Sequence, residues 1–249
     1  MEKRTKKEAP SITTDLRSDT IQVPSVIRNC SGIRIFGKRI KSLIFTTDIA
    51  IILNNDADAV IAVYPFTPHP AVIQSIANVS TIPILSGVGG GTTQGKRSAN
   101  IALFSEAQGS LAVVVNAPTP LETIKQIEET VDIPIVCTIV SEYMDIQARL
   151  DAGVDILNVS GGSDTAYIVS RIREKFPDVP IIATGGPDDE AIMETINAGA
   201  NAISWTPPSN GELFRRKMDK YREKEREKYM QSHQGLTIEE VEELEEHKD

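Results

Sequence analysis

The stretch from Pro180 to Ser209, PIIATGGPDDEAIMETINAGANAISWTPPS, contains one complete strand–helix–strand unit. Its first apolar run, Ile181 to Ala183, shows no alternation, which is typical of a parallel strand that is covered on both faces. Asp188 is a favourable residue for capping the start of the helix, and Gly199 is a favourable residue for ending it. The run Ala202 to Trp205 then predicts a second strand, so this unit indicates how the rest of the chain is built.

The same rhythm of short apolar runs and amphipathic segments extends back to Lys41. The expected strands are Leu43–Thr46, Val60–Tyr64, Ile82–Leu85, Leu111–Val115, Ile133–Val140, Ile156–Val159, Ile181–Ala183 and Ala202–Trp205. Eight strands at a spacing of roughly 20 to 25 residues favour an α/β fold of the closed (β/α)8 TIM-barrel type. An open Rossmann-like or flavodoxin-like sheet is the alternative, but Thr46-Thr47-Asp48 stands where its glycine fingerprint would be expected.

We expect three parts in the chain: an N-terminal arm over residues 1–32, the barrel over residues 33–230, and a C-terminal helical tail over residues 231–249. Ile33 to Ile40 alternates around a glycine, which predicts a small hairpin that closes one end of the barrel. The segment after Gly211 is predicted to be helical, either as a solvated last barrel helix followed by a short surface helix, or as an oligomerisation or lid element. Its apolar stripe, Leu236, Ile238, Val241 and Leu244, requires a cover from the same chain or from another.

Composition excludes several classes of function. The net charge of -9 argues against nucleic acid as a partner, and the basic cluster Lys3 to Lys7 is expected to be a solvated tail. No membrane span and no targeting segment is expected. Cys30 and Cys137 lie far apart, without the spacing of a disulfide framework or a metal site, so a reducing cytoplasm is the expected compartment.

In a barrel of this kind the ligand lies where strands end and the following loops begin. The polar and glycine-rich residues at the ends of the expected strands are Thr47 and Asp48; Tyr64, Thr67 and His69; Ser86 to Arg97; Asn116; Thr138 to Glu142; Asn158 to Gly162; Thr184 to Gly186; and Ser204 to Thr206. Their polarity contrasts with the apolar strands before them, so we expect a small-molecule site at this end.

Ser86 to Arg97, SGVGGGTTQGKR, is the most distinctive of these segments. Gly89, Gly90 and Gly91 allow backbone amides to converge on an anion, and Lys96 and Arg97 bring positive charge. The segment is not a P-loop, because Arg97 stands where the Mg²⁺-binding Ser or Thr belongs. We expect a long ligand-binding loop here, with a flexible lid as the alternative.

Gly161-Gly162 and Gly185-Gly186 follow two neighbouring strands and let the backbone approach a ligand closely. Three stretches of the second half resemble the aldolase-type, phosphate-binding TIM barrels, including nitronate monooxygenase-like and IMP dehydrogenase-like barrels: AGVDILNVSGG (152–162), VPIIATGG (179–186) and NAGANAISW (197–205). The resemblance implies that Gly185 and Gly186 form the first phosphate-binding turn. The family's second turn is replaced by Trp205-Thr206-Pro207-Pro208, so FMN is a possible cofactor but not the favoured one.

The candidate catalytic residues are Asp48, His69 and Glu142, because each follows an expected strand and each side chain can transfer protons. The alternative role of the two carboxylates is helix capping, since Asp48 precedes a helix at Ile49 and Glu142 is expected in a first helical turn. Asn116 and Asn158 are candidates for binding hydroxyl or carbonyl groups of a ligand. No lysine lies in an expected barrel strand for Schiff-base chemistry, and with three histidines in the chain no metal site is expected.

These observations lead to one function and two alternatives. The leading hypothesis is an enzyme that acts by acid–base chemistry on a small polar molecule, with a phosphorylated or nucleotide-like molecule as one option, and works as a hydrolase, isomerase or lyase. The first alternative is a non-catalytic barrel that senses a metabolite and regulates a partner. The second is an FMN-dependent oxidoreductase. The expected partners are the small-molecule ligand and, through the C-terminal helices, a second copy of the chain.

Overall fold

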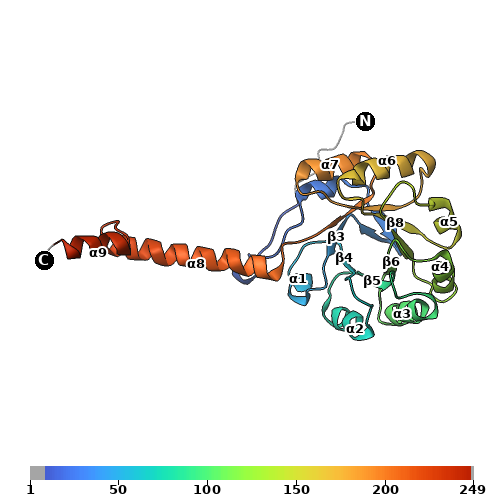
Figure 1. Ribbon diagram of the computed structural model, residues 1–249, viewed down its shortest axis with the longest axis horizontal. Coiled ribbons are helices and arrows are strands. Elements are labelled where there is room, and N and C mark those ends of the chain that lie inside the picture. The colour runs from blue at the N-terminus through green and yellow to red at the C-terminus, as the bar shows by residue number, and fades with distance from the viewer. Residues whose placement is uncertain (1–8, 248–249) are drawn as a thin grey trace. The chain divides into compact units, whose positions relative to one another are not determined.

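The computed structural model describes residues 9–247 and contains a closed barrel of eight parallel strands, surrounded by helices (Figure 1). The barrel strands are β3 (Ser42–Phe45), β4 (Ala59–Ala62), β5 (Ile84–Gly89), β6 (Ala112–Val115), β7 (Ile135–Ile139), β8 (Ile156–Val159), β9 (Ile181–Thr184) and β10 (Ala202–Trp205). The helices between them are α1 (Ile49–Leu53), α2 (Pro70–Val79), α3 (Gly95–Ala107), α4 (Leu121–Glu128), α5 (Ile146–Asp151), α6 (Thr165–Lys175) and α7 (Asp189–Asn197). The chain therefore has the predicted (β/α)8 TIM-barrel fold.

The strands pair in the order β10-β3-β4-β5-β6-β7-β8-β9, and β10 closes the barrel by pairing Ile203 with Ser42. The unit that predicted the fold is confirmed as β9, α7 and β10. Asp188 accepts a hydrogen bond from the backbone N–H of Ala191, and Gly199 takes a φ of +113° after the helix. Uninterrupted burial along β4, β6 and β8 explains their continuous apolar sequence.

An apolar hairpin closes the amino end of the barrel. β1 (Ile33–Ile35) and β2 (Lys38–Ile40) pair antiparallel, as the alternation predicts. Ile33, Ile35 and Ile40 belong to one buried cluster with inward-facing side chains of the strands, among them Leu43 and Val136. Burial of each such side chain contributes about 1.5 to 3 kcal/mol, so the hairpin is a substantial part of the core.

Polar groups at this amino end are paired with side chains. Asp58 accepts from the backbone N–H groups of Lys41 and Ser42, and Asp155 accepts from that of Ile135. Asn201 accepts from the N–H of Ile181. Arg173 donates to Asn201 and to backbone carbonyls before β9 and before β10. Because unpaired buried polar groups are costly, these contacts stabilise the loops that enter the strands.

The described part of the N-terminal arm, residues 9–32, lies along the outside of the barrel (Figure 1). It contains two short 3-10 helices, η1 (Asp15–Arg17) and η2 (Ser25–Asn29), and η2 packs beside α7 (Figure 1). Ile27 and Cys30 are buried, and Ser31 accepts a hydrogen bond from Asn201. The basic cluster Lys3 to Lys7 lies outside the described residues.

The chain divides between Pro207 and Pro208 into two compact units. The second unit contains α8 (Asn210–Ser232) and α9 (Ile238–Glu246), and α8 buries none of its residues. A capping box formed by Ser209 and Glu212 begins α8. Among the residues that the structure describes, no helix combines the length and the apolar character needed to cross a membrane.

Candidate functional site

The carboxyl end of the barrel presents a layer of mixed polar and apolar side chains. Successive side chains of a strand alternate between the interior and the surrounding helices. Because Leu43, Ile61, Val136, Ile156, Ile182 and Ala202 face the interior cluster, the residues two positions later along each strand or at its end share that direction. These residues are Phe45, Val63, Thr138, Asn158, Thr184 and Ser204.

Asn158, at this end of β8, has an unsatisfied polar atom. Asn158 is only 8% exposed, and its Nδ2 atom donates to Thr138 Oγ1 in a long hydrogen bond of 3.4 Å. Its Oδ1 is buried and has no hydrogen-bond partner among the described residues. If the amide were turned the other way, the open atom would be a nitrogen instead, so one polar atom stays open in either orientation. A buried group of this kind favours a bound polar molecule as its partner.

Two arcs of different chemistry surround this layer. The arc from β6 to β10 presents uncharged hydrogen-bonding groups, while its outer loops carry acidic residues such as Glu142 and Asp188; the uncharged groups are Asn116, Thr138, Asn158, Thr184 and Ser204. The arc from β3 to β5 is apolar inside the barrel, with Phe45 and Val63, and carries charged residues in its loops: Asp48, His69, Lys96 and Arg97. A ligand with one polar edge and one apolar face fits this arrangement.

Asp48 follows β3 and serves as the N-cap of α1. Its Oδ1 accepts from the backbone N–H groups of Ala50 at 2.9 Å and of Ile51 at 3.3 Å. This is the capping role that the sequence offered as the alternative to catalysis. The carboxylate is half-buried at the barrel rim, so capping occupies Oδ1 and does not remove Asp48 from the site.

His69 follows β4 and serves as the N-cap of α2. Its Nδ1 accepts from the backbone N–H of Ala71 at 3.1 Å, and Tyr64 Oη accepts from the N–H of His69 at 2.7 Å. Because Nδ1 acts as an acceptor, the neutral ring carries its proton on Nε2. Asp48 and His69 thus cap the helices that follow two adjacent strands, and the Nε2 atom of His69 is not used by its cap.

Glu142 follows β7, three strands away from β4 around the barrel. The expected helix start at Glu142 is wrong: α5 begins at Ile146, and Asp145 is the residue that caps it. Glu142 instead lines a hollow of about 530 Å³ between α5 and α6, together with Tyr143, Tyr167 and Arg171. The loop that carries Glu142 is therefore not adjacent to the loops that carry Asp48 and His69, and its catalytic role stays a prediction.

The glycine-rich segment is mostly regular structure, which corrects the expected loop from Ser86 to Arg97. Ser86 to Gly89 complete β5, and α3 begins at Gly95, so a short turn is left between them. Gly90 and Thr93 exchange two backbone hydrogen bonds of 3.0 and 3.1 Å, and Ser98 Oγ donates to the carbonyl of Thr93. The segment is a compact, hydrogen-bonded turn.

Close packing explains several of these glycines. A Cβ on Gly90, whose φ is +133°, would lie 2.5 Å from Asn116 Cβ, and one on Gly89 would lie 2.6 Å from Ser98 Oγ. Gly91 has open space around it and needs glycine only for its φ of +59°. Lys96 and Arg97 are exposed in the first turn of α3, which has no side-chain cap and no acidic residue there. Positive charge therefore gathers at the start of α3.

The two glycine pairs of the second half are also packed closely. A Cβ on Gly161 would lie 2.3 Å from Ile168 Cδ1, and one on Gly186 would lie 2.2 Å from Ala191 Cβ. The N–H of Gly185 donates to the carbonyl of Ser204, and Gly162 is exposed with a φ of +63°. The first turn of α7 contains Asp189 and Glu190 behind its cap Asp188, and this negative charge disfavours phosphate there.

The two buried thiols, Cys30 and Cys137, do not belong to the layer of side chains at the carboxyl end of the barrel. Burial raises the pKa of Cys30 to about 11 and also raises the pKa of Cys137, the latter against the opposing effect of the Arg149 guanidinium. Such thiols stay protonated and unreactive at neutral pH. Within residues 9–247 no group of three or more His, Cys, Asp or Glu side chains is placed to hold a metal ion.

Phe45 also lies at the carboxyl end of the barrel, although it is not among the expected site residues. The expected residues are polar and follow the strands, whereas Phe45 is apolar and is the last residue of β3. The alternation from Leu43 is a signal that would have found it, since it places Phe45 on the same inward face.

Comparison with known proteins gives the architecture. No protein-family model matches the chain, and no curated protein matches it either. Among solved structures, a phosphonopyruvate hydrolase in complex with oxalate and Mg²⁺ is similar with a TM-score of 0.55 and 13% identity, over 86% of this chain and 93% of that one. QR15, an aldolase, is similar with a TM-score of 0.51 and 15% identity, over 70% and 90%.

A 4-hydroxy-tetrahydrodipicolinate synthase from Methylacidiphilum fumariolicum SolV is similar with a TM-score of 0.52 and 14% identity, over 66% of each chain. At such identities the likeness shows the fold alone. The chain therefore has a (β/α)8 TIM-barrel architecture, and the resemblance to aldolase-type, nitronate monooxygenase-like and IMP dehydrogenase-like barrels stays a prediction.

Proposed function

We propose that the barrel is an enzyme that binds a small polar molecule at its carboxyl end and acts on it by acid–base chemistry. The observation that carries the proposal is the open polar atom of Asn158, buried in the innermost polar layer of the mouth. A ligand hydroxyl or amide group that pairs with it gains a hydrogen bond and removes the penalty of an unsatisfied buried group.

The ligand class follows from the two arcs. Thr138, Asn158, Thr184 and Ser204 supply hydrogen bonds without charge, which suits hydroxyl, carbonyl or amide groups on one edge of the ligand. Phe45 lies across the barrel, where an apolar face of a sugar or a base would pack. The deep part of the ligand is therefore uncharged in this proposal.

A phosphate group, if the ligand has one, would lie at the start of α3 in this proposal. Lys96 and Arg97 support this placement, because they are exposed cations in the first turn of a helix that has no acidic residue there. The N–H of Gly95 already donates to Thr123 Oγ1, so the later N–H groups of this turn are the ones left for an anion. The glycine turn after β8 is less suitable for phosphate, since the N–H of Gly161 already donates to Thr165 Oγ1. The turn after β9 is less suitable too, since Gly185 already donates to Ser204 and acidic residues begin α7. The same reasoning disfavours the FMN alternative.

His69 is the proposed proton donor, and Asp48 is the proposed base or orienting carboxylate. Both lie in the loops after adjacent strands, and the Nε2 of His69 carries the transferable proton when Nδ1 accepts from Ala71. A Schiff-base lyase is disfavoured, because none of the eight barrel strands contains a lysine. Isomerisation, hydrolysis and other acid–base lyase reactions remain within the proposal.

The binding step is tested with a thermal-shift panel of sugars, polyols and nucleosides, each with and without a phosphate group. A ligand that binds the folded state at 100 times its Kd stabilises it by about 2.7 kcal/mol. We expect a compound that shifts the wild type and fails to shift Asn158→Leu, with Asn100→Leu on the exposed side of α3 as the matched control. An equal shift in Asn158→Leu would remove Asn158 from the site.

The chemical step is tested with the compound so found. His69→Asn keeps a side chain that caps α2 well but cannot transfer a proton. We expect turnover, followed by NMR, to fall by about 100-fold or more while the thermal shift is retained. Unchanged turnover would exclude His69 as the acid.

A metabolite sensor is the second candidate, and one observation favours it. None of the eight barrel strands carries Asp, Glu, His, Lys or Arg, so every acid or base would have to come from a loop. A sensor would bind the compound through Asn158 without consuming it over hours at high protein concentration. Steady conversion of the compound would exclude a purely sensing role.

A further inference from the structure

The two helices of the C-terminal unit differ in charge. α8 contains eight Lys and Arg against five Asp and Glu, a net charge of +3. From Ile238 to Leu244, α9 contains Glu239, Glu240, Glu242 and Glu243 and no basic residue. The two helices are therefore electrostatically complementary.

Each helix also exposes an apolar stripe. In the first half of α8, Phe214 and Tyr221 are 66% and 51% exposed, and Met218 lies between them at helical spacing. In α9, Ile238 and Leu244 are 54% and 50% exposed on either side of Val241. Two well-capped helices that each expose such a stripe require a cover for it.

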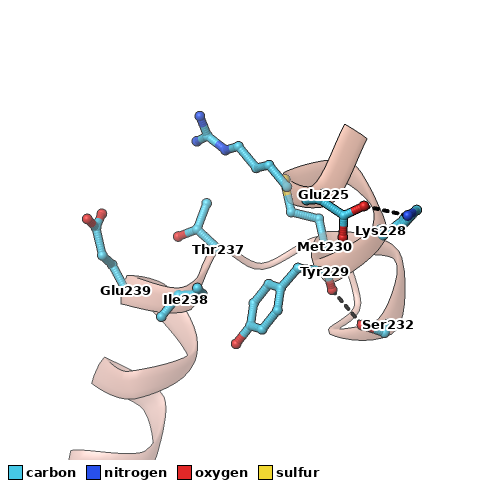
Figure 2. A pocket seen from close by; sticks show the side chains of 9 residues that line it. Glu225, Lys228, Tyr229, Met230, Ser232, Thr237, Ile238 and Glu239 are labelled. Carbon is cyan, nitrogen blue, oxygen red and sulfur yellow. Dashed lines mark hydrogen bonds and ion pairs between the residues drawn. The ribbon is translucent and has the colours of Figure 1, made fainter. Parts of the chain in front are cut away.

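A hollow of about 740 Å³ lies at the elbow where α9 leaves α8 (Figure 2). Tyr229, Met230 and Ile238 give it apolar walls, and Glu225, Arg226 and Glu239 give it a charged rim. The ion pair between Lys228 and Glu225 lies along one side. The hollow therefore suits an apolar side chain that is flanked by charges.

Helix length decides which copy of the chain can supply an α9 that covers the first half of α8. α9 has nine residues and is about 13 Å long, while Phe214 lies eighteen residues before Ser232, about 27 Å from the end of α8. If α9 folds back along its own α8, it therefore ends short of Phe214 and Met218. The first half of α8 can be covered by α9 only when α9 comes from another molecule.

We propose that the C-terminal unit is a homodimerisation module in which the elbow and acidic α9 of each copy pack on the first half of α8 of the other. The contact is isologous: α9 of the first copy covers the stripe on α8 of the second, and α9 of the second copy covers the stripe on α8 of the first. Glu242 and Glu243 lie against the basic residues that flank Phe214 and Tyr221, including Arg215 and Arg222. This inference goes beyond the proposed function and does not depend on it.

The mass of the full chain in solution, measured by light scattering at low salt, tests the module. We expect a dimer for the wild type and a monomer for Glu242→Lys/Glu243→Lys. Adding Arg215→Glu/Arg222→Glu to that variant restores opposite charges, and we expect the dimer to return. Glu190→Lys/Glu194→Lys, on exposed positions of α7, is the matched control and stays dimeric.

A cross-linking experiment identifies the contact. Tyr221→Cys and Val241→Cys are prepared as separate proteins, mixed and oxidised, because the native Cys30 and Cys137 are buried. We expect a disulfide-linked species that contains one chain of each kind. A monomeric wild type, charge-reversed variants that stay dimeric, or the absence of the mixed species would each overturn the proposal. Ligand-induced thermal shifts of the barrel are a separate readout, so failure here leaves the proposed function untouched.

Discussion

The two ends of the barrel differ in whether their buried polar groups are hydrogen-bonded. At the amino end, Asp58, Asp155 and Asn201 accept hydrogen bonds from strand N–H groups, and Arg173 connects the loops around them. At the carboxyl end, Asn158 has an open polar atom in a mouth of mixed chemistry. The difference separates the part of the barrel that holds the fold together from the part that is left for a ligand.

The comparison also explains the placement of the hairpin. β1 and β2 close the amino end with isoleucines that pack into the interior cluster of the barrel. Polar groups that are left open in a core cost stability, and proteins retain them mainly where function uses them. Substitutions at the two ends should therefore differ in the size, and even in the sign, of their effect on stability.

The largest effect is expected for Ile40→Ala in the hairpin. Ile40 is buried in the cluster that fills the amino end, so truncation removes apolar contacts and leaves a cavity. We expect a loss of about 2 to 5 kcal/mol in the free energy of unfolding, measured by urea titration. Phe45→Ala, at the half-open carboxyl end, is the comparison and should cost clearly less. Equal losses of unfolding free energy in the two variants would show that the two ends of the barrel contribute equally to stability.

Arg173→Ala is expected to have the next largest effect. Arg173 donates to the carbonyls of Pro177, Val179 and Gly199 and to Asn201 Oδ1, and desolvation lowers its pKa, which fits its partly buried position. Removal leaves these acceptors partly unpaired, at a cost of about 2 to 3 kcal/mol in urea unfolding. Arg171→Ala, which breaks an exposed ion pair with Glu174, should cost below about 1 kcal/mol. A loss no larger than that of Arg171→Ala would contradict the role assigned to Arg173.

Much of the fold was predictable because it rests on local patterns. The unit from Pro180 to Ser209 and the alternation of Ile33 to Ile40 each encode their structure within a few residues. The bounds of β5 were not predictable, because glycines at its end indicate a loop in isolation. In the barrel, Gly87 and Gly89 continue the strand where neighbouring side chains approach: a Cβ on Gly87 would lie 3.1 Å from Val63 Cγ2.

The site was less predictable, because the role of each polar side chain depends on which hydrogen-bond partners the fold places beside it. Sequence spacing placed Asp48 and His69 at the rim, but their hydrogen bonds to Ala50 and Ala71 follow from the local geometry of two helix starts. Asn158 was a candidate among many polar residues. Only the packing of its neighbours distinguishes it, since an open polar atom is a property of the surroundings and not of the residue type.

Asn158→Leu tests the difference between the two ends of the barrel, because it is expected to raise the free energy of unfolding instead of lowering it. The substitution nearly conserves volume and replaces an amide that has one weak hydrogen bond and one open atom. We expect the free energy of unfolding to rise by about 1 kcal/mol in urea titrations without ligand, together with the loss of ligand-induced stabilisation. Thr138→Val removes the other partner of the 3.4 Å contact and serves as control, with little change in stability. A destabilised Asn158→Leu would mean that water or protein satisfies the amide in solution.

An effect of no more than about 1 kcal/mol is also expected at Asp48, where capping and catalysis can be separated. Asp48→Ala removes the acceptor of two backbone N–H groups and should cost about 1 kcal/mol, whereas Asp48→Asn keeps a favourable cap and should cost little. If the carboxylate takes part in proton transfer, both variants lose turnover, although only the first loses stability. If Asp48 only caps α1, Asp48→Asn retains full turnover. Urea unfolding and turnover measured on the same preparations thus decide whether the carboxyl end uses this residue for structure alone or also for chemistry.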